Sequence, residues 1–160
     1  MDTLSALANS ALAQWLSVSM LGVPTLMGLH SIGMAIVVGL SLMLTLRLFG
    51  VFIGFRAALI PKLLGVALWG FLLNFVTGLG IFVSRADDYV QSGLFIFKMI
   101  LVLLSALILF ELKRRLYVAE EGASAAVVDR TSQAMSLLAT TLLFAAVVAG
   151  RLLAYLSNLY

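Results

Sequence analysis

His30 is the single histidine of the chain, and two methionines surround it at helical spacing. Met27 lies three residues before it and Met34 four residues after it, so one face of a helix would carry all three side chains. Imidazole together with thioether sulfur suits Cu(I), and imidazole also ligates haem iron. The alternative is a packed histidine that hydrogen-bonds to a neighbouring helix, with the methionines as apolar filling. Residue types alone leave both roles open.

The composition around this group indicates a membrane protein. The chain has 160 residues, of which 63% are hydrophobic and 11% are charged, and its mean hydropathy is +1.17. Soluble domains contain ~25% charged residues, so this chain belongs to the integral membrane class. It has no cysteine, which excludes disulfides and thiolate metal sites. The net charge of +3 comes from basic residues in loops, which indicates membrane topology and not nucleic-acid binding.

Four stretches are long and apolar enough to cross a bilayer. A spanning helix needs about 20 mostly apolar residues, and the predicted spans cover about 23–46, 63–83, 93–112 and 135–157. We therefore expect an all-α integral membrane protein in which residues 23–160 form a four-helix bundle. Residues 47–62 are apolar enough to lie along the interface, and Pro61 marks a break before the second span. Asp129 or Thr131 is expected to cap the fourth span.

Residues 1–22 form a separate segment with an amphipathic pattern. Between Leu4 and Leu16 the apolar residues recur at helical spacing, while serine, asparagine and glutamine fall largely on the other face. The pattern predicts a helix over residues 3–21 that lies flat in the interface, with Trp15 at headgroup level. The alternative is a fifth, weak span whose polar face would meet lipid.

The basic residues predict the orientation of the spans. Seven of the ten lysines and arginines fall in the loops 47–62 and 113–135, whereas the loop 84–92 carries Arg85 beside Asp87 and Asp88. Cytoplasmic loops carry the excess of basic residues, so 47–62 and 113–135 are expected in the cytoplasm. The prediction is a multi-pass protein of the bacterial inner membrane with both termini on the outer, periplasmic side.

Small residues mark the expected contacts between helices, because lipid gives helices no hydrophobic reason to associate. Gly70, Asn74 and Gly78 recur every four residues on one face of the second span. Glycines there let a neighbour approach, and the Asn74 amide can bond across the gap. Two further small pairs follow the same spacing, Ala35 with Gly39 and Ala146 with Gly150.

Polar residues of all four spans fall at one depth near the outer boundary. From helical rise, His30 lies ~10 Å, Lys98 ~8 Å and Arg151 ~9 Å below the boundary, and Thr77 comes to a similar level. No carboxylate lies in the spans at this level. We expect His30, Lys98, Arg151 and Thr77 to border a ligand-binding cavity that receives an anionic or polar group.

Three sources of that group remain open. Asp87 or Asp88 can fold back from the outer loop, a lipid phosphate or a ligand's carboxylates can bind, or a partner protein can supply an acid. The alternative to a cavity is that Lys98 and Arg151 extend their charged ends to the outer headgroups.

Four short motifs give the chain a family resemblance. They are "LHSIG" (29 to 33), "LRLFG" (46 to 50), "LNFVTGLGIF" (73 to 82) and "FKMILVLL" (97 to 104). Over residues 26–116 the chain resembles a family of small bacterial inner-membrane proteins of four helices with no assigned function. It is more distantly similar to the membrane domain of copper-resistance protein D. The resemblance implies that His30, Arg47 and Lys98 are the matching positions. This chain has no second histidine, so a haem held by two of its own histidines is excluded.

The expected function is non-catalytic. The sequence carries no nucleophile–base arrangement, no paired carboxylates in a span and no nucleotide motif, and a proton-coupled transporter would normally carry acids within its spans. We expect an accessory or structural subunit of a larger membrane complex of the redox, electron-transport type. The alternative is a membrane protein that binds haem, quinone or Cu(I) around His30. Expected partners are the lipid bilayer, including bound lipid, and a membrane protein or further copies of the chain.

Overall fold

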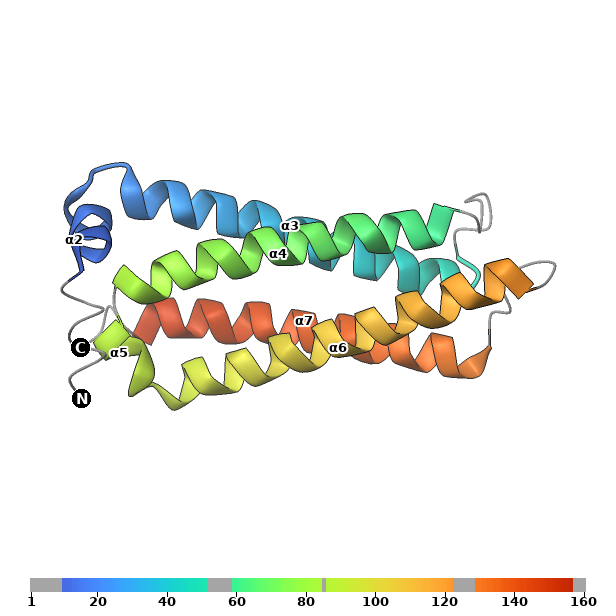
Figure 1. Cartoon of the computed structure of the whole chain (residues 1–160). Helices are drawn as coiled ribbons and strands as arrows, with labels where there is room; N and C mark the ends of the chain where they lie inside the picture. Colours follow the sequence, from blue (N-terminus) through green and yellow to red (C-terminus); the bar gives the residue numbers. More distant parts are fainter. Residues whose placement is uncertain (1–9, 52–58, 85, 123–128, 157–160) are drawn as a thin grey trace.

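The computed structural model describes residues 10–51, 59–84, 86–122 and 129–156. Four long helices make up most of this part of the chain: α3 (Gly22–Leu48), α4 (Ile60–Ser84), α6 (Gly93–Gly122) and α7 (Arg130–Leu156). Two short helices, α2 (Ala11–Val18) and α5 (Ala86–Val90), precede α3 and α6. The described residues contain no strand, and the expected all-α four-helix bundle is confirmed (Figure 1).

Each of the four long helices contains a stretch able to span a membrane. The described stretches that are long and apolar enough are Gly22–Leu48, Lys62–Ser84, Gly93–Leu116 and Arg130–Tyr155. They contain or largely overlap the four predicted spans. Pro61 lies in the first turn of α4, where its missing N–H disturbs no helical hydrogen bond. The chain is therefore a multi-pass membrane protein.

The bundle consists of two antiparallel hairpins. The most extensive contacts join α3 with α4 and α6 with α7, and less extensive contacts of α3 with α7 and of α4 with α6 join the hairpins (Figure 1). The helix ends Gly22, Ser84, Gly93 and Leu156 come together at one end, here called the α5 end. The opposite end, here called the basic end, holds Leu48, Ile60 and Arg130.

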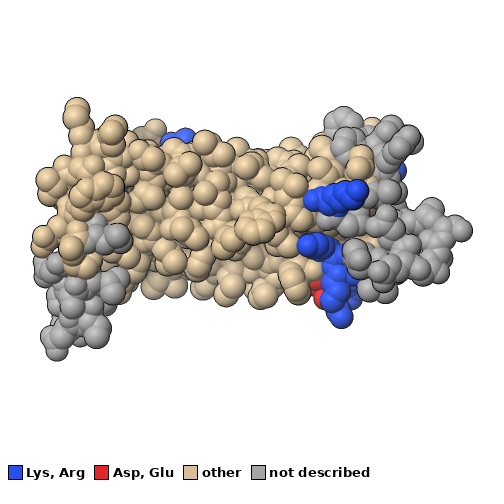
Figure 2. Space-filling model, turned by 45° about the horizontal axis from the view of Figure 1, so that its top comes forward, with Lys and Arg blue, Asp and Glu red and all other residues tan. Residues whose placement is uncertain are grey.

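The surface between the two ends is apolar. Large hydrophobic side chains are exposed along all four long helices, among them Ile32, Trp69, Leu103 and Val148. On the face shown in Figure 2, lysines and arginines gather toward the basic end, and the surface between the ends is almost free of charge. Such an apolar belt with charge at its rim is what a lipid bilayer requires of the protein surface.

The apolar core lies mainly in the half of the bundle toward the basic end. The buried cluster contains Val37, Leu44, Leu48, Ile60, Leu64, Leu109, Leu112, Leu116, Ala139 and Leu143. These residues come from all four long helices and fall in the last turns of α3, the first turns of α4, the later half of α6 and the first half of α7. The half toward the α5 end is packed differently, through glycines and polar side chains.

Two helix ends at the basic end have well-defined caps. α3 ends in a Schellman motif: Gly50 has φ 82°, its N–H bonds to the Arg47 carbonyl at 3.1 Å, and the Val51 N–H bonds to the Leu46 carbonyl at 2.9 Å. At the start of α7, Asp129 Oδ1 accepts a bond from the Ser132 N–H at 2.8 Å. Of the two expected caps, Asp129 is therefore the one whose side chain bonds the helix start.

The described part of the N-terminal segment folds back on the bundle. α2 contacts both α3 and α4, and a side chain on Gly22 would meet the Leu16 carbonyl at 2.8 Å. Leu16 is buried, whereas Trp15 at the preceding position is 64% exposed. Helix is thus present over part of the predicted range 3–21, with Leu16 toward the bundle; residues 3–9 of that prediction lie outside the described residues.

Candidate functional site

His30 lies on α3 and turns its ring onto α4. Its Nδ1 is 2.9 Å from the Asn74 carbonyl oxygen and 3.2 Å from the Thr77 hydroxyl oxygen. A carbonyl oxygen only accepts hydrogen bonds, so His30 Nδ1 carries the proton and donates a hydrogen bond to the Asn74 carbonyl oxygen. In the neutral imidazole this tautomer puts the lone pair on Nε2.

Asn74 also donates a hydrogen bond to His30 across the same pair of helices. Its side-chain amide donates to the His30 carbonyl oxygen at 2.8 Å, so each residue's side chain bonds the other's backbone. Thr77 adds a third polar group, and its hydroxyl bonds the Leu73 carbonyl of its own helix at 2.7 Å. Reciprocal bonds of this kind satisfy polar groups that lipid cannot, and they hold the imidazole in one orientation.

Glycines allow α3 and α4 to approach this closely. A side chain on Gly33 would meet the Asn74 backbone nitrogen at 2.8 Å, and one on Gly70 would meet Ile36 Cγ2 at 2.6 Å. The His30 ring lies over Gly78, where an added Cβ would be 3.1 Å from its Cε1. The structure thus places Gly70, Asn74 and Gly78 against α3. The predicted pair Ala35 and Gly39 is exposed instead, and Gly33 makes the close contact from α3.

Lys98 reaches into the bundle from α6. Its side chain lies across Gly150 of α7, with Cε and Nζ each 3.4 Å from where a Cβ would stand. It is half-buried and comes from the second hairpin, whereas His30 comes from the first. Within the described residues the ion pairs join Glu111 to Arg114 and Arg115, in the later half of α6. No carboxylate there is paired with Lys98.

Arg151 does not join these groups. It is exposed on α7, although it follows Gly150 directly in the sequence. Consecutive helical residues differ by about 100° in direction, so Gly150 faces Lys98 while Arg151 faces outward. The charged end of Arg151 therefore fits the predicted alternative of extension toward the headgroups. Asp87 and Asp88 lie on α5, but their side chains fall outside the described residues.

The structure brings His30, Asn74 and Thr77 into direct contact and places Lys98 at a similar depth on α6; these four residues are here called the polar layer. By helical rise they lie ~8 to ~15 Å from the ends of their helices at the α5 end. The predicted metal ligands differ in their surroundings: Met27 is 50% exposed and Met34 is partly buried. The layer offers one ammonium group, which can bind an anionic group, and one imidazole lone pair, which can accept a hydrogen bond from a donor.

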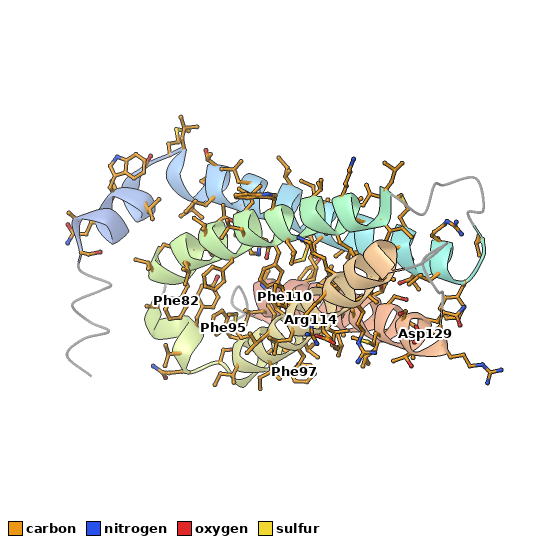
Figure 3. All side chains as sticks on the ribbon, turned by 45° about the vertical axis from the view of Figure 1, so that its right-hand side comes forward. Phe82, Phe95, Phe97, Phe110, Arg114 and Asp129 are labelled. Carbon is orange, nitrogen blue, oxygen red and sulfur yellow. The ribbon has the colours of Figure 1, made fainter. Side chains whose placement is uncertain are left out.

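Stacked aromatic rings lie at the α5 end next to this layer. The Phe82 and Phe95 ring centroids are 5.5 Å apart, and Tyr89 lies 5.2 Å from Phe95 (Figure 3). The rings come from α4, α5 and α6 and fasten α5 to the ends of the two longer helices. Phe95 is three residues before Lys98, so the stack lies about one helical turn closer to the end of the bundle.

Sequence reasoning missed a second polar group inside the bundle. Thr45 and Thr140 share a hydrogen bond of 2.9 Å between α3 and α7, and Ser41, Ser105 and Ser136 are buried beside apolar neighbours. In the described part of the chain, the Ser41 hydroxyl is the buried side-chain group without a hydrogen-bond partner. The sequence pattern that could have predicted this group is a four-residue spacing of small polar residues, found in Ser41 with Thr45 and in Ser132, Ser136 and Thr140.

Comparison with known proteins supplies no relative for this chain. No protein-family model, no curated protein and no solved structure matches it. The interpretation of the polar layer therefore rests on the contacts, burial and charge described above.

Proposed function

We propose that this chain is a non-catalytic accessory subunit of a larger membrane complex of the redox type, and that its polar layer receives an acidic group of a partner subunit. The observation that carries this proposal is Lys98, a half-buried cation across Gly150 with no carboxylate paired to it among the described residues. Charges within membranes normally pair or face a cavity. A carboxylate from a neighbouring membrane protein would complete the layer.

The orientation belongs to the same proposal. The basic end would face the cytoplasm, because the excess of lysine and arginine is found there. The polar layer would then lie in the periplasmic half of a bacterial inner membrane, where a partner's helix reaches it from within the bilayer.

The test uses Lys98→Met in the full chain within its native membrane. The substitution removes the charge and keeps a long flexible side chain. Replacing a half-buried cation that no carboxylate in the described part of the chain pairs with should leave the thermal stability of the purified chain unchanged or higher. Assembly should respond in the opposite direction: the fraction of the tagged chain in a high-mass complex, measured after mild detergent extraction, should fall.

Two controls make the result specific. Lys62→Met changes an exposed lysine near the other end of the bundle and should leave assembly intact. The double variant Asp87→Asn with Asp88→Asn tests whether the acid belongs to this chain, and assembly should persist in it. A wild-type chain that forms no complex with another protein, or a Lys98→Met chain that assembles normally, would contradict the proposal.

A second candidate function follows from the orientation of His30. Its Nδ1 is bound to the Asn74 carbonyl, which leaves Nε2 as the nitrogen for a ligand. Histidines that hold metals are commonly oriented by such a bond from the other ring nitrogen. In this candidate the chain itself binds haem, quinone or Cu(I) near the polar layer.

Optical spectra, metal analysis and quinone extraction of gently purified protein would test this candidate. A bound chromophore, copper or quinone should be stoichiometric in the wild type and lost in His30→Gln, while Met27→Leu should retain haem or quinone. Wild-type protein without any of these would exclude the candidate and leave the accessory-subunit proposal standing.

A further inference from the structure

The corner between α2 and α3 carries a group of strongly exposed apolar side chains. Trp15 and Val18 on α2 are 64% and 86% exposed, and Met20 and Leu21, which join α2 to α3, are 92% and 74% exposed. These four residues are here called the corner patch. The sequence has no lysine, arginine, aspartate or glutamate in residues 10–46, so this stretch brings no charge to the patch. Contiguous exposed apolar surface of this kind marks a site of contact with a membrane or a protein.

Backbone contacts hold the corner in one shape. The Ser19 N–H bonds to the Trp15 carbonyl at 2.9 Å, and the Gly22 N–H bonds to the Ser19 carbonyl at 3.1 Å. A side chain on Gly22 would meet the Leu16 carbonyl at 2.8 Å, so the chain turns tightly there. Leu16 is buried, and α2 contacts both α3 and α4. The bundle thus fixes one side of α2 and leaves Trp15 and Val18 on its outer side.

The corner patch continues the apolar surface of α3. Leu21 precedes α3 in a helical backbone conformation, so it extends the helix by one position. Ile32 follows 11 residues later, about three turns, and therefore lies on the same side of the helix axis. Ile32 is 54% exposed, and Thr25 and Gly28 on this side are exposed as well. Leu21 therefore points sideways from α3, in the direction of the belt that lipid covers.

The length of α3 indicates the depth of the corner patch. Its 27 residues extend ~40 Å by helical rise, whereas the hydrocarbon core of a bilayer is ~30 Å thick. The charged side chains at the basic end belong in one headgroup region, so the corner at the other end of α3 reaches the opposite headgroup region. Tryptophan is enriched at this level of membrane proteins, because its ring is apolar and its N–H is polar.

We propose that the corner patch inserts into the boundary between headgroups and acyl chains, in the leaflet at the α5 end. Leu16 holds α2 on the bundle, while Trp15, Val18, Met20 and Leu21 contact lipid. Three of these four residues lie beyond the predicted apolar face, which ended at Leu16. The patch has no cation to select a headgroup, so it should accept neutral and anionic lipids alike. The inference does not depend on the proposed partner subunit.

The two tryptophans of the chain allow a direct measurement of depth. Trp69 on α4 is 72% exposed and lies nine residues after Ile60, ~14 Å along the helix and within the hydrocarbon core. Trp69→Phe leaves Trp15 as the fluorophore, and Trp15→Phe leaves Trp69 as the reference. The full chain is reconstituted in phosphatidylcholine bilayers whose lipids carry bromine near the headgroup end or near the methyl end of the acyl chains.

The two single-tryptophan proteins should respond in opposite order. Bromine near the headgroups should quench Trp15 fluorescence more than bromine near the chain ends, so the ratio of the two should exceed one. The ratio should fall below one for Trp69. Adding phosphatidylglycerol to the bilayer, or raising the salt concentration, should leave the quenching of Trp15 unchanged, because the corner patch binds without charge.

A matched pair of substitutions tests the patch itself in the Trp69→Phe protein. Met20→Glu adds a charge that favours water, so bromolipid quenching of Trp15 should fall and quenching by aqueous iodide should rise. Met20→Leu stays apolar and should match Met20. The Met20 side chain is 92% exposed, so both variants should fold. Unchanged quenching of Trp69 when Met20→Glu is made in the Trp15→Phe protein would verify this.

Three results would overturn the inference. Quenching of Trp15 by iodide but not by bromolipids would place the corner patch in water and leave it for a protein partner. Stronger quenching of Trp15 by bromine near the chain ends would place α2 inside the hydrocarbon core. Equal quenching of Trp15 in the Met20→Glu and Met20→Leu proteins would show that Met20 does not contact the bilayer.

Discussion

At the scale of single residues, the glycines of this bundle have unequal roles. Gly33 lies against the α4 backbone, where an added Cβ would be 2.8 Å from the Asn74 nitrogen and 2.9 Å from the Gly70 carbonyl oxygen. Backbone atoms cannot move aside as a flexible side chain can. Gly39, six residues later on the same helix, has nothing within 4 Å of an added Cβ. Substitutions at Gly33 and at Gly39 therefore distinguish the effect of the helix contact on stability from the effect of glycine's own conformational preference.

Gly33→Ala should destabilise the protein by ~1–3 kcal/mol, because the added methyl group forces α3 and α4 apart. Gly39→Ala should be neutral or stabilising by up to about 1 kcal/mol, because alanine favours helix. Asn74→Ala removes one bond between helices and should cost ~0.6 kcal/mol. Thermal or denaturant unfolding in detergent would rank the three. If Asn74→Ala lowered the stability most, Asn74 would have a role beyond packing α3 against α4.

The depth of the polar residues was predictable from the sequence, but their directions were not. Counting residues from the span ends placed His30, Lys98 and Arg151 at one level. Direction depends on how each helix is rotated about its axis, and neighbouring apolar residues on all sides of these helices give little information about that rotation. Arg151 is therefore exposed, while Gly150 beside it contacts Lys98.

At the scale of the helices, the helix ends have more specific sequence features than the helix interiors. The "LRLFG" motif is explained by Gly50, whose φ of 82° closes the Schellman motif of α3. α6 continues to Gly122, beyond the predicted limit near Leu112. Glu111 pairs with Arg114 and Arg115 at 2.9 and 3.0 Å, which supports the helix as it enters the polar region. Hydropathy alone identifies the apolar part of such a helix and not its polar continuation.

Gly50→Ala should destabilise the protein by ~1–2 kcal/mol, because a Cβ is disfavoured in the left-handed backbone conformation. The space around Gly50 is open, so the loss would come from the backbone alone. Gly50→Asn should recover part of the stability, because asparagine tolerates this conformation. Equal stability of the wild type and Gly50→Ala in thermal unfolding would show that α3 ends differently in the membrane.

The Asp129 cap predicts a pH dependence of stability. Hydrogen bonds from the Ser132 hydroxyl and N–H hold the pKa of Asp129 below its usual value. Its folded-state pKa is lowered, so its contribution to stability is present above the unfolded pKa of ~3.9 and is lost as pH falls through the folded pKa. Asp129→Ala should lower the melting temperature at neutral pH, and the deficit should shrink in acid.

Asp129→Asn is the matched control for that experiment. Asparagine also caps helices but does not titrate in this range, so it should keep most of the stability and lose the acid dependence. Melting temperatures of the three proteins between pH 7 and about pH 3 would test both statements. An acid dependence of Asp129→Ala equal to that of the wild type would assign the titration to other groups.

At the scale of the whole molecule, the two ends of the bundle differ in charge and in packing. The basic end holds most of the lysines and arginines and lies nearer the apolar core, while the α5 end holds the polar layer and the aromatic stack. The α2 and α5 helices both lie at the α5 end (Figure 1). The four spans and their antiparallel order followed from hydropathy, because an uninterrupted apolar stretch has few alternatives in a bilayer.

Reporter fusions would test the predicted orientation. The basic loops predict a cytoplasmic signal for a fusion at position 55, and a periplasmic signal for fusions at position 88 and at the C-terminus. The physical reason is the excess of lysine and arginine in residues 47–62 and 113–135. A cytoplasmic signal at position 88 or at the C-terminus would reverse the orientation and place the polar layer in the inner half of the membrane.

The division into two hairpins has a consequence for biosynthesis. The bonds between His30 and Asn74 lie within the first hairpin, so α3 and α4 can dock while the ribosome is still translating α6. The ties between the hairpins join residues far apart in the chain, Thr45 with Thr140 and Leu48 with Gln133. They form only after the second hairpin has entered the bilayer. The chain order thus allows the imidazole to be oriented before Lys98 enters the bilayer.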